Sequence, residues 1–167
     1  MKDQVIIITG AAMGLGLATA ELLAKEGAKL VLVDYNDDAL KDAEKKLKEI
    51  NPEVALLSVK ADVSSEEQVK NYVDQAVKQF GRIDGLYNNA GIEGKQAPII
   101  DYDLDVFKKV IDINLMGVYY GLRYVIPVMQ KQNFGRIVNV ASVGGIRGVL
   151  NQMPYVASKH AVSGMTK

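Results

Sequence analysis

The sequence contains no cysteine, no tryptophan and a single histidine. Without cysteine there are no disulfides and no thiolate metal ligands, and one histidine, His160, excludes a multi-histidine metal centre. Lys and Arg together number 20, as do Asp and Glu, so the chain has no excess of positive charge for a broad nucleic-acid surface. We therefore expect no metal site and no nucleic-acid partner.

Long apolar runs are also missing. None approaches the ~20 residues that a membrane-spanning helix needs. The apolar run that follows Met1–Gln4 is too short for the core of a signal peptide. The sequence therefore predicts a cytoplasmic protein without membrane contact. Its 167 residues, 49% of them hydrophobic, predict one domain with a substantial core.

Short runs of β-branched residues alternate with longer amphipathic stretches. The runs predict strands over Val5–Ile8, Leu30–Val33, Val54–Val59, Ile83–Tyr87 and Arg136–Val140. The stretches predict helices over Leu17–Glu26, Asp37–Ile50, a segment that ends at Phe80, Asp103–Gln130 and Tyr155–Lys167. We expect Ser64 to cap the third helix, since Glu67 follows at the spacing of a capping box. Strands without polar alternation are typical of a parallel sheet covered by helices, so the fold class is α/β, a Rossmann-like doubly wound sheet.

A glycine-rich turn joins the first strand to the first helix. Gly10, Gly14 and Gly16 follow the pattern G-x-x-x-G-x-G, with Met13 and Leu15 between them. This pattern differs from both the G-x-G-x-x-G fingerprint and the P-loop. Glycines there would let a pyrophosphate approach the free N–H groups at the helix N-terminus. The alternative is a tight turn that binds no ligand.

Asp34 ends the second strand, close to the spacing from the glycine turn that is expected of a ribose-binding acid. A carboxylate there accepts hydrogen bonds from ribose hydroxyls and repels a 2′-phosphate. The neighbouring Met13, Tyr35 and Asn36 supply no cation for such a phosphate, which favours NAD over NADP. The alternative is that Asp34 is a helix cap or turn residue.

Polar and small residues also follow the third and fourth strands. Asp62 and Val63 come after the third strand, and Asn89, Ala90 and Gly91 come after the fourth. Open α/β sheets bind ligands at this carboxyl edge, so we expect these residues to line a cofactor crevice. Taken singly, each also fits a structural turn.

Four residues in the second half are candidates for catalysis. Tyr155 and Lys159 lie four residues apart, on one helix face, where the ammonium would favour a phenolate able to exchange a proton with an alcohol or ketone. Ser142 follows the fifth strand, where its hydroxyl would hold the substrate oxygen. Asn114 lies inside an apolar helix and would bind a water near Lys159. The alternatives are an exposed helix pair, a turn serine, and an asparagine that is exposed or bonded to the backbone.

The order of these motifs from Val5 to Lys167 resembles the short-chain dehydrogenase/reductase family. The matching motifs are Thr9-Gly10-x-x-x-Gly14-x-Gly16, Asp34, Asp62, Asn88-Asn89-Ala90-Gly91, Asn114, Ser142 and Tyr155-x-x-x-Lys159. The resemblance implies hydride transfer between NAD(H) and a small alcohol or ketone of cyclic-ketone, sugar or oxoacyl type. It makes Tyr155 the acid/base and a contact of the cofactor, Lys159 its activator and a ligand of the nicotinamide ribose, Ser142 the group that polarises the carbonyl, and Asn114 part of a water relay.

The resemblance also bears on length and assembly. Family members continue after the Tyr-x-x-x-Lys motif with further strands and a substrate-binding segment, so residues 1–167 are expected to form a Rossmann-type domain that lacks the C-terminal strands of the family. The long apolar helix and the Tyr155 helix resemble the pair through which family members form homodimers and homotetramers. The alternative is a truncated nucleotide-binding or interaction module without turnover.

Overall fold

A five-stranded parallel sheet forms the centre of the protein in a computed structural model that describes residues 1–167. The strands are β1 (Val5–Thr9), β2 (Lys29–Asp34), β3 (Leu56–Lys60), β4 (Gly85–Asn88) and β5 (Arg136–Asn139). Their order is β3-β2-β1-β4-β5, and every neighbouring pair is parallel. The order reverses between β1 and β4, which opens a crevice at the carboxyl ends of these strands. The predicted α/β class and Rossmann-like sheet are confirmed.

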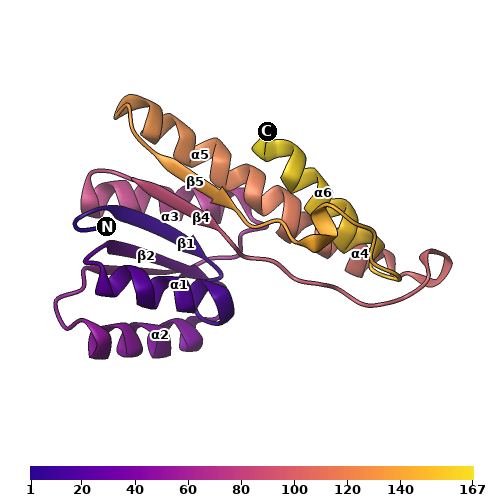
Figure 1. Cartoon of the computed structure of the whole chain (residues 1–167), viewed down its shortest axis with the longest axis horizontal. Coiled ribbons are helices and arrows are strands. Elements are labelled where there is room, and N and C mark those ends of the chain that lie inside the picture. Colours follow the sequence, from indigo (N-terminus) through magenta and orange to yellow (C-terminus); the bar gives the residue numbers. More distant parts are fainter.

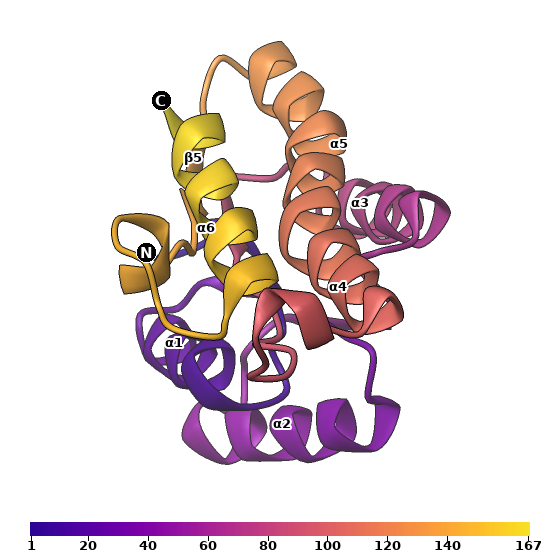
Figure 2. The same ribbon diagram turned by 90° about the vertical axis from the view of Figure 1, so that its right-hand side faces the viewer.

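Helices cover both faces of the sheet (Figure 1). On one face lie α1 (Gly14–Lys25) and α2 (Asp37–Ile50). On the other face lie α3 (Glu66–Phe80) and α5 (Gly117–Lys131), and α4 (Leu104–Ile111) continues the line of α5 beyond the ends of the strands. Figure 2 shows α6 (Met153–Thr166) running alongside α4 and α5. No helix has the length and apolarity that crossing a membrane requires.

Alternate residues of the central strands feed two separate hydrophobic cores. Ile7 and Val31 pack with the buried Tyr72 of α3, whereas Ile8 and Leu32 pack with Leu40 of α2. Burying each such aliphatic side chain contributes roughly 1.5–3 kcal/mol to stability. The strands of the sheet centre therefore need apolar residues at every position, which is why their sequences lack polar alternation.

The edge strand β5 differs from this pattern. It pairs with β4 alone, Ile137 is half-buried, and the side chain of Val138 is 55% exposed. β5 is therefore an edge strand with one half-buried face and one exposed face.

The cap of α3 corrects a sequence-based prediction. Ser65, and not Ser64, is the N-cap, because the Ser65 hydroxyl accepts a hydrogen bond from the backbone N–H of Gln68. The Ser64 hydroxyl instead donates to the Asp62 carboxylate at 2.7 Å. Ser64 belongs to the turn that follows β3, so the helix begins one residue later than the Ser64–Glu67 spacing predicts.

The long helix predicted over Asp103–Gln130 is also interrupted. Between α4 and α5 the residues Asp112–Met116 form a π-helical turn, in which Gly117 donates its backbone N–H to the carbonyl of Asp112. Single π turns inside α-helices are frequent at functional sites because they insert one extra residue and redirect its side chain. Here the turn contains Asn114, which is fully buried.

Candidate active site

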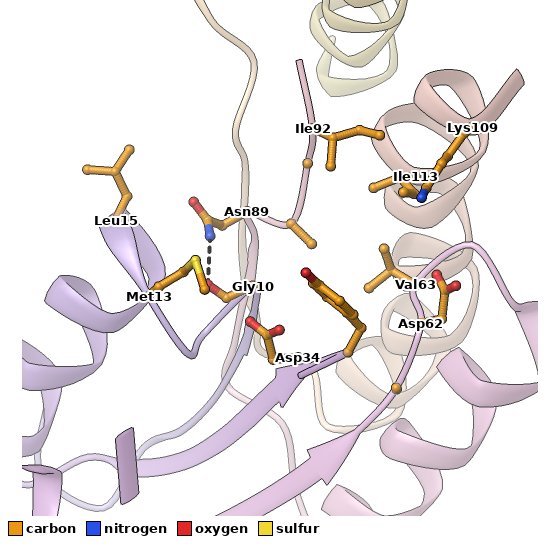
Figure 3. Close-up of a pocket in the computed structure, with 14 residues that line it drawn as sticks. Gly10, Met13, Leu15, Asp34, Asp62, Val63, Asn89, Ile92, Lys109 and Ile113 are labelled. Atoms are coloured by element: carbon orange, nitrogen blue, oxygen red, sulfur yellow. Dashed lines mark hydrogen bonds between the residues drawn. The ribbon is translucent and has the colours of Figure 1, made fainter. Parts of the chain in front are cut away.

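A cavity of about 510 Å³ opens at the carboxyl edge of the sheet (Figure 3). Its wall contains most of the residues that the sequence predicts to bind a cofactor, namely Gly10, Met13, Leu15, Asp34, Asp62, Val63, Asn89, Ala90 and Gly91. Gly14, Gly16, Tyr155 and Lys159 do not line it. The first two shape the glycine turn, and the other two lie in α6, beyond the cavity wall.

The glycine turn depends on residues without side chains. Gly10 and Gly14 have φ values of +63° and +55°, which favour glycine. Any Cβ at Gly16 would collide with the carbonyl oxygen of Gly10, so only glycine allows α1 to begin so close to β1. Met13, the N-cap of α1, makes no side-chain capping bond. The first N–H groups of α1 thus remain free for an anion, and the helix dipole favours one there.

Asn89 connects the glycine turn to the loop after β4. Its amide donates to the carbonyls of Thr9 and Gly10 at 3.0 and 3.3 Å, and Figure 3 shows the bond to Gly10. The Thr9 hydroxyl in turn accepts bonds from the backbone N–H groups of Asn89 and Ala90 at 3.0 and 3.1 Å. Asn89 therefore braces the turn and also lines the cavity.

The Asp34 carboxylate is held by backbone groups alone. One oxygen accepts from Ala12 N–H and the other from Asn36 N–H, both at 3.1 Å, and the residue is 6% exposed. The helix-cap role falls to Asn36, which caps α2 by accepting from Ala39 N–H. No salt bridge involves Asp34. Its negative charge therefore stays available to a ligand in the cavity.

Asp62 and Val63 form the far wall of the cavity. Asp62 is exposed and accepts bonds from the Ser64 backbone N–H at 2.9 Å and from its hydroxyl, so it is a turn residue as well as a lining residue. Val63 is buried and packs against Gly117, the first residue of α5, where a Cβ would come within 2.9 Å of it. Val63 therefore offers the cavity a fixed apolar surface.

Sequence reasoning missed five lining residues: Tyr35, Ala61, Ile92, Lys109 and Ile113. Lys109 matters most, because the preference for NAD was argued from a loop without cations. Figure 3 places Lys109 beside Ile113, across the cavity from Asp34. Lys109 lies one helical turn before Ile113 and so shares a helix face with it, which is the one sequence feature that could have indicated its role. Only the tertiary fold, however, brings α4 to the cavity.

Lys159 is the most unusual charged residue of the second half. It is 4% exposed, its ammonium donates to the Val140 carbonyl at 2.8 Å, and it lies 5.8 Å from the centre of the Tyr155 ring. Burial lowers the pKa of Lys159 below its ordinary value, because a buried ammonium loses its hydration. A buried lysine with so few partners costs stability, which makes it a candidate functional group.

Ser142 and Tyr155 both lie next to Gly144. The Ser142 hydroxyl accepts from Gly144 N–H at 3.1 Å and caps the short 3-10 helix Val143–Gly145. A Cβ on Gly144 would lie 3.2 Å from Cε1 of Tyr155 and 3.6 Å from Oγ of Ser142. Ser142 is thus a turn residue, and its hydroxyl and the Tyr155 ring both lie on the side of Gly144 where a Cβ would stand.

Asn114 clamps the segment after β4. Its Oδ1 accepts from Ile92 N–H at 2.8 Å, while its Nδ2 donates to the Ile92 carbonyl at 2.9 Å. A Cβ on Gly91 would lie 3.1 Å from Asn114 Oδ1 and 3.4 Å from Lys159 Nζ. The backbone-bonded alternative therefore describes Asn114, and its amide and the Lys159 ammonium both lie near Gly91.

The geometry defines a class of protein: a doubly wound nucleotide-binding fold with a serine, a tyrosine and a buried lysine beyond the nucleotide cavity. Comparison with known proteins agrees. The family model described as short chain dehydrogenase matches residues 4–167, and the chain belongs to this family. The predicted family membership is confirmed.

Individual relatives extend the comparison. Levodione reductase from Leifsonia aquatica is 50% identical over 165 residues, which cover 99% of this chain and 62% of that protein. Cyclohexanol dehydrogenase from an Acinetobacter species is 36% identical over 166 residues, which cover 99% of this chain and 65% of that protein. The crystal structure of NAD⁺-bound xylitol dehydrogenase superposes with a TM-score of 0.95 at 44% identity, covering 99% of this chain and 63% of that one. The chain thus spans a little under two thirds of the length of these relatives.

Proposed function

We propose that the whole protein is an NAD(H)-dependent oxidoreductase that interconverts a small alcohol and the corresponding ketone. The observation that carries the proposal is the convergence of Ser142 and Tyr155 at Gly144 with the burial of Lys159 beside the same ring. The names of the relatives, a ketone reductase and an alcohol dehydrogenase among them, support the same reaction class. Cyclic ketones, sugars and oxoacyl compounds are all candidate substrates.

The cavity residues fit NAD(H). The glycine turn and the free N-terminus of α1 suit a pyrophosphate, and the backbone-anchored carboxylate of Asp34 suits the adenosine ribose. Val63 and Ile113 offer apolar surface for adenine. NAD-bound neighbours with the same fold support this assignment. The bound cofactor supplies the hydride-exchanging nicotinamide, whereas the protein supplies position, protons and charge.

Each catalytic side chain has a separate task. The Tyr155 hydroxyl exchanges a proton with the substrate oxygen, and the Ser142 hydroxyl donates a hydrogen bond to the same oxygen. The positive charge of Lys159 stabilises the Tyr155 phenolate, and Lys159 also binds the nicotinamide ribose. Asn114 holds the segment after β4 against the π turn and completes a proton relay from Lys159 through water.

Assembly and location belong to the same proposal. The outer face of α5 exposes Tyr119 by 40% and Ile126 by 37%, an apolar surface that supports a homodimer or homotetramer. The cytoplasmic location stays a prediction. Light scattering and cell fractionation test these two points.

Turnover by the whole protein with a panel of cyclic ketones and sugars tests the function. We expect NADH oxidation with at least one substrate class and its loss in Tyr155→Phe. Tyr119→Phe is the matched control, because the Tyr119 hydroxyl bonds only to Arg123, four residues away on an exposed helix face. Full turnover in Tyr155→Phe would overturn the assignment of the acid/base, and binding of NADH without turnover of any substrate would favour a binding module.

A further inference from the structure

One buried hydroxyl has no part in the catalytic scheme above. Ser158 of α6 is 0% exposed and lies between Tyr155 and Lys159 in the sequence. Its Oγ donates to the Tyr155 carbonyl at 2.7 Å and accepts from Nδ2 of Asn114 at 3.2 Å. Ser158 thus connects the helix that holds the tyrosine and lysine with the π turn between α4 and α5.

The donor and the acceptor of each hydrogen bond between Ile92, Asn114, Ser158 and Tyr155 can be assigned. The Ile92 N–H can only donate, so the Asn114 atom that faces it is Oδ1, and Nδ2 faces the Ile92 carbonyl and Ser158. The Ser158 oxygen therefore accepts a hydrogen bond from Asn114 Nδ2, and the Ser158 hydroxyl donates a hydrogen bond to the Tyr155 carbonyl. Both N–H bonds of the buried Asn114 amide are satisfied only when Ser158 carries a hydroxyl.

Asn114 Oδ1 and Lys159 Nζ lie near the same side of Gly91. A Cβ on Gly91 would lie 3.1 Å from Oδ1 and 3.4 Å from Nζ. A buried N–H that loses its acceptor is costly, so without the Ser158 hydroxyl the Asn114 amide is held by Ile92 alone and is freer to rotate and carry Oδ1 with it. A rotation of the Asn114 amide would thus change the surroundings of the Lys159 ammonium.

We propose that Ser158 is a positioning residue, which orients the Asn114 amide so that the relay from Lys159 is held in one geometry. Ser158 does this without touching substrate or cofactor. The inference rests on the proposed function, because the geometry of the relay affects turnover only if Tyr155 and Lys159 carry the proton step.

Ser158→Ala in the whole protein tests the proposal, with Ser163→Ala as the matched control. Ser163 lies on the same helix and also bonds to backbone carbonyls, those of Gly145 and Lys159, but not to Asn114. We expect kcat to fall by about 10-fold to 100-fold in Ser158→Ala, the cost of a small misplacement in an active site. KM for NADH should change by less than about twofold, and Ser163→Ala should keep the kcat of the wild type.

Two further variants separate positioning from helix packing. Ser158→Thr retains a hydroxyl that can bond to the same carbonyl, and it should recover most of the lost kcat. In an Asn114→Ala background, Ser158→Ala should lower kcat no further, whereas a packing defect would lower it by the same factor in both backgrounds.

Each possible failure has its own signature. Wild-type kcat in Ser158→Ala, together with an inactive Tyr155→Phe, overturns the positioning inference and leaves the proposed function standing. Turnover in Tyr155→Phe overturns the proposed function itself.

Discussion

The two halves of the protein position their functional groups in different ways. In the nucleotide half, the Asp34 carboxylate accepts only from backbone N–H groups, and glycines shape the turn that the Asn89 side chain braces. In the catalytic half, the side chains of Asn114 and Lys159 bond to Ile92, Ser158 and Val140. The comparison teaches that the cofactor side follows from the backbone of strands and turns that the sequence marks, whereas the catalytic side requires the packing of α6 on the π turn.

Replacing Lys159 should give the largest effect on turnover. Lys159→Met removes the charge beside Tyr155, and we expect kcat to fall by at least about 100-fold, the usual contribution of a positioned acid/base. Its free energy of unfolding should not fall, because burial disfavours the charge that is removed. Steady-state kinetics and urea unfolding measure the two quantities, and a large loss of stability would contradict this account of Lys159.

The same lysine predicts a pH dependence. Because the pKa of Lys159 is lower in the folded chain than in the unfolded chain, the unfolded state binds the proton more tightly. At low pH the buried charge of Lys159 therefore lowers the free energy of unfolding. This free energy rises as the pH increases from the lowered pKa of the folded chain to the pKa of the unfolded chain. Urea unfolding at several alkaline pH values should show this rise in the wild type and lack it in Lys159→Met.

Gly16→Ala should weaken cofactor binding in the nucleotide half. A Cβ there meets the Gly10 carbonyl, so the glycine turn must move and the affinity for NADH should fall by more than about tenfold. Gly164→Ala is the control, since nothing lies near its Cβ position in α6. Fluorescence titration with NADH measures both, and an unchanged dissociation constant in Gly16→Ala would show that the turn does not hold the cofactor.

Asp34→Ala should have a smaller effect that is specific to the ribose. Loss of the carboxylate removes hydrogen bonds to the ribose and the repulsion of a 2′-phosphate, so NAD affinity falls by about tenfold and discrimination against NADP narrows. Asp38→Ala, on an exposed position of α2, is the control. Titrations with both cofactors test this, and a wild type that prefers NADP would refute the argument, with Lys109 across the cavity the first residue to examine.

The success of the sequence-based predictions follows the same division. Strands of uninterrupted apolar residues, the glycine turn and Asp34 are encoded locally, so the fold and most of the cavity wall were predictable. The π turn at Asn114 was not, because Asp112–Met116 has an ordinary helical composition and the turn is tied to Ile92 by bonds across the fold. Lys109 and Ser158 escaped notice because only the tertiary fold brings α4 to the cavity and brings Ser158 to Asn114.

The central claim is that Tyr155 performs the proton step at a site whose nucleotide half is independent of it. The most direct test measures NADH binding and turnover in the same preparation of Tyr155→Phe, made in the whole protein. We predict a dissociation constant for NADH within about twofold of the wild type, since Tyr155 does not line the cavity, and the loss of turnover. Wild-type turnover in this variant would contradict the claim.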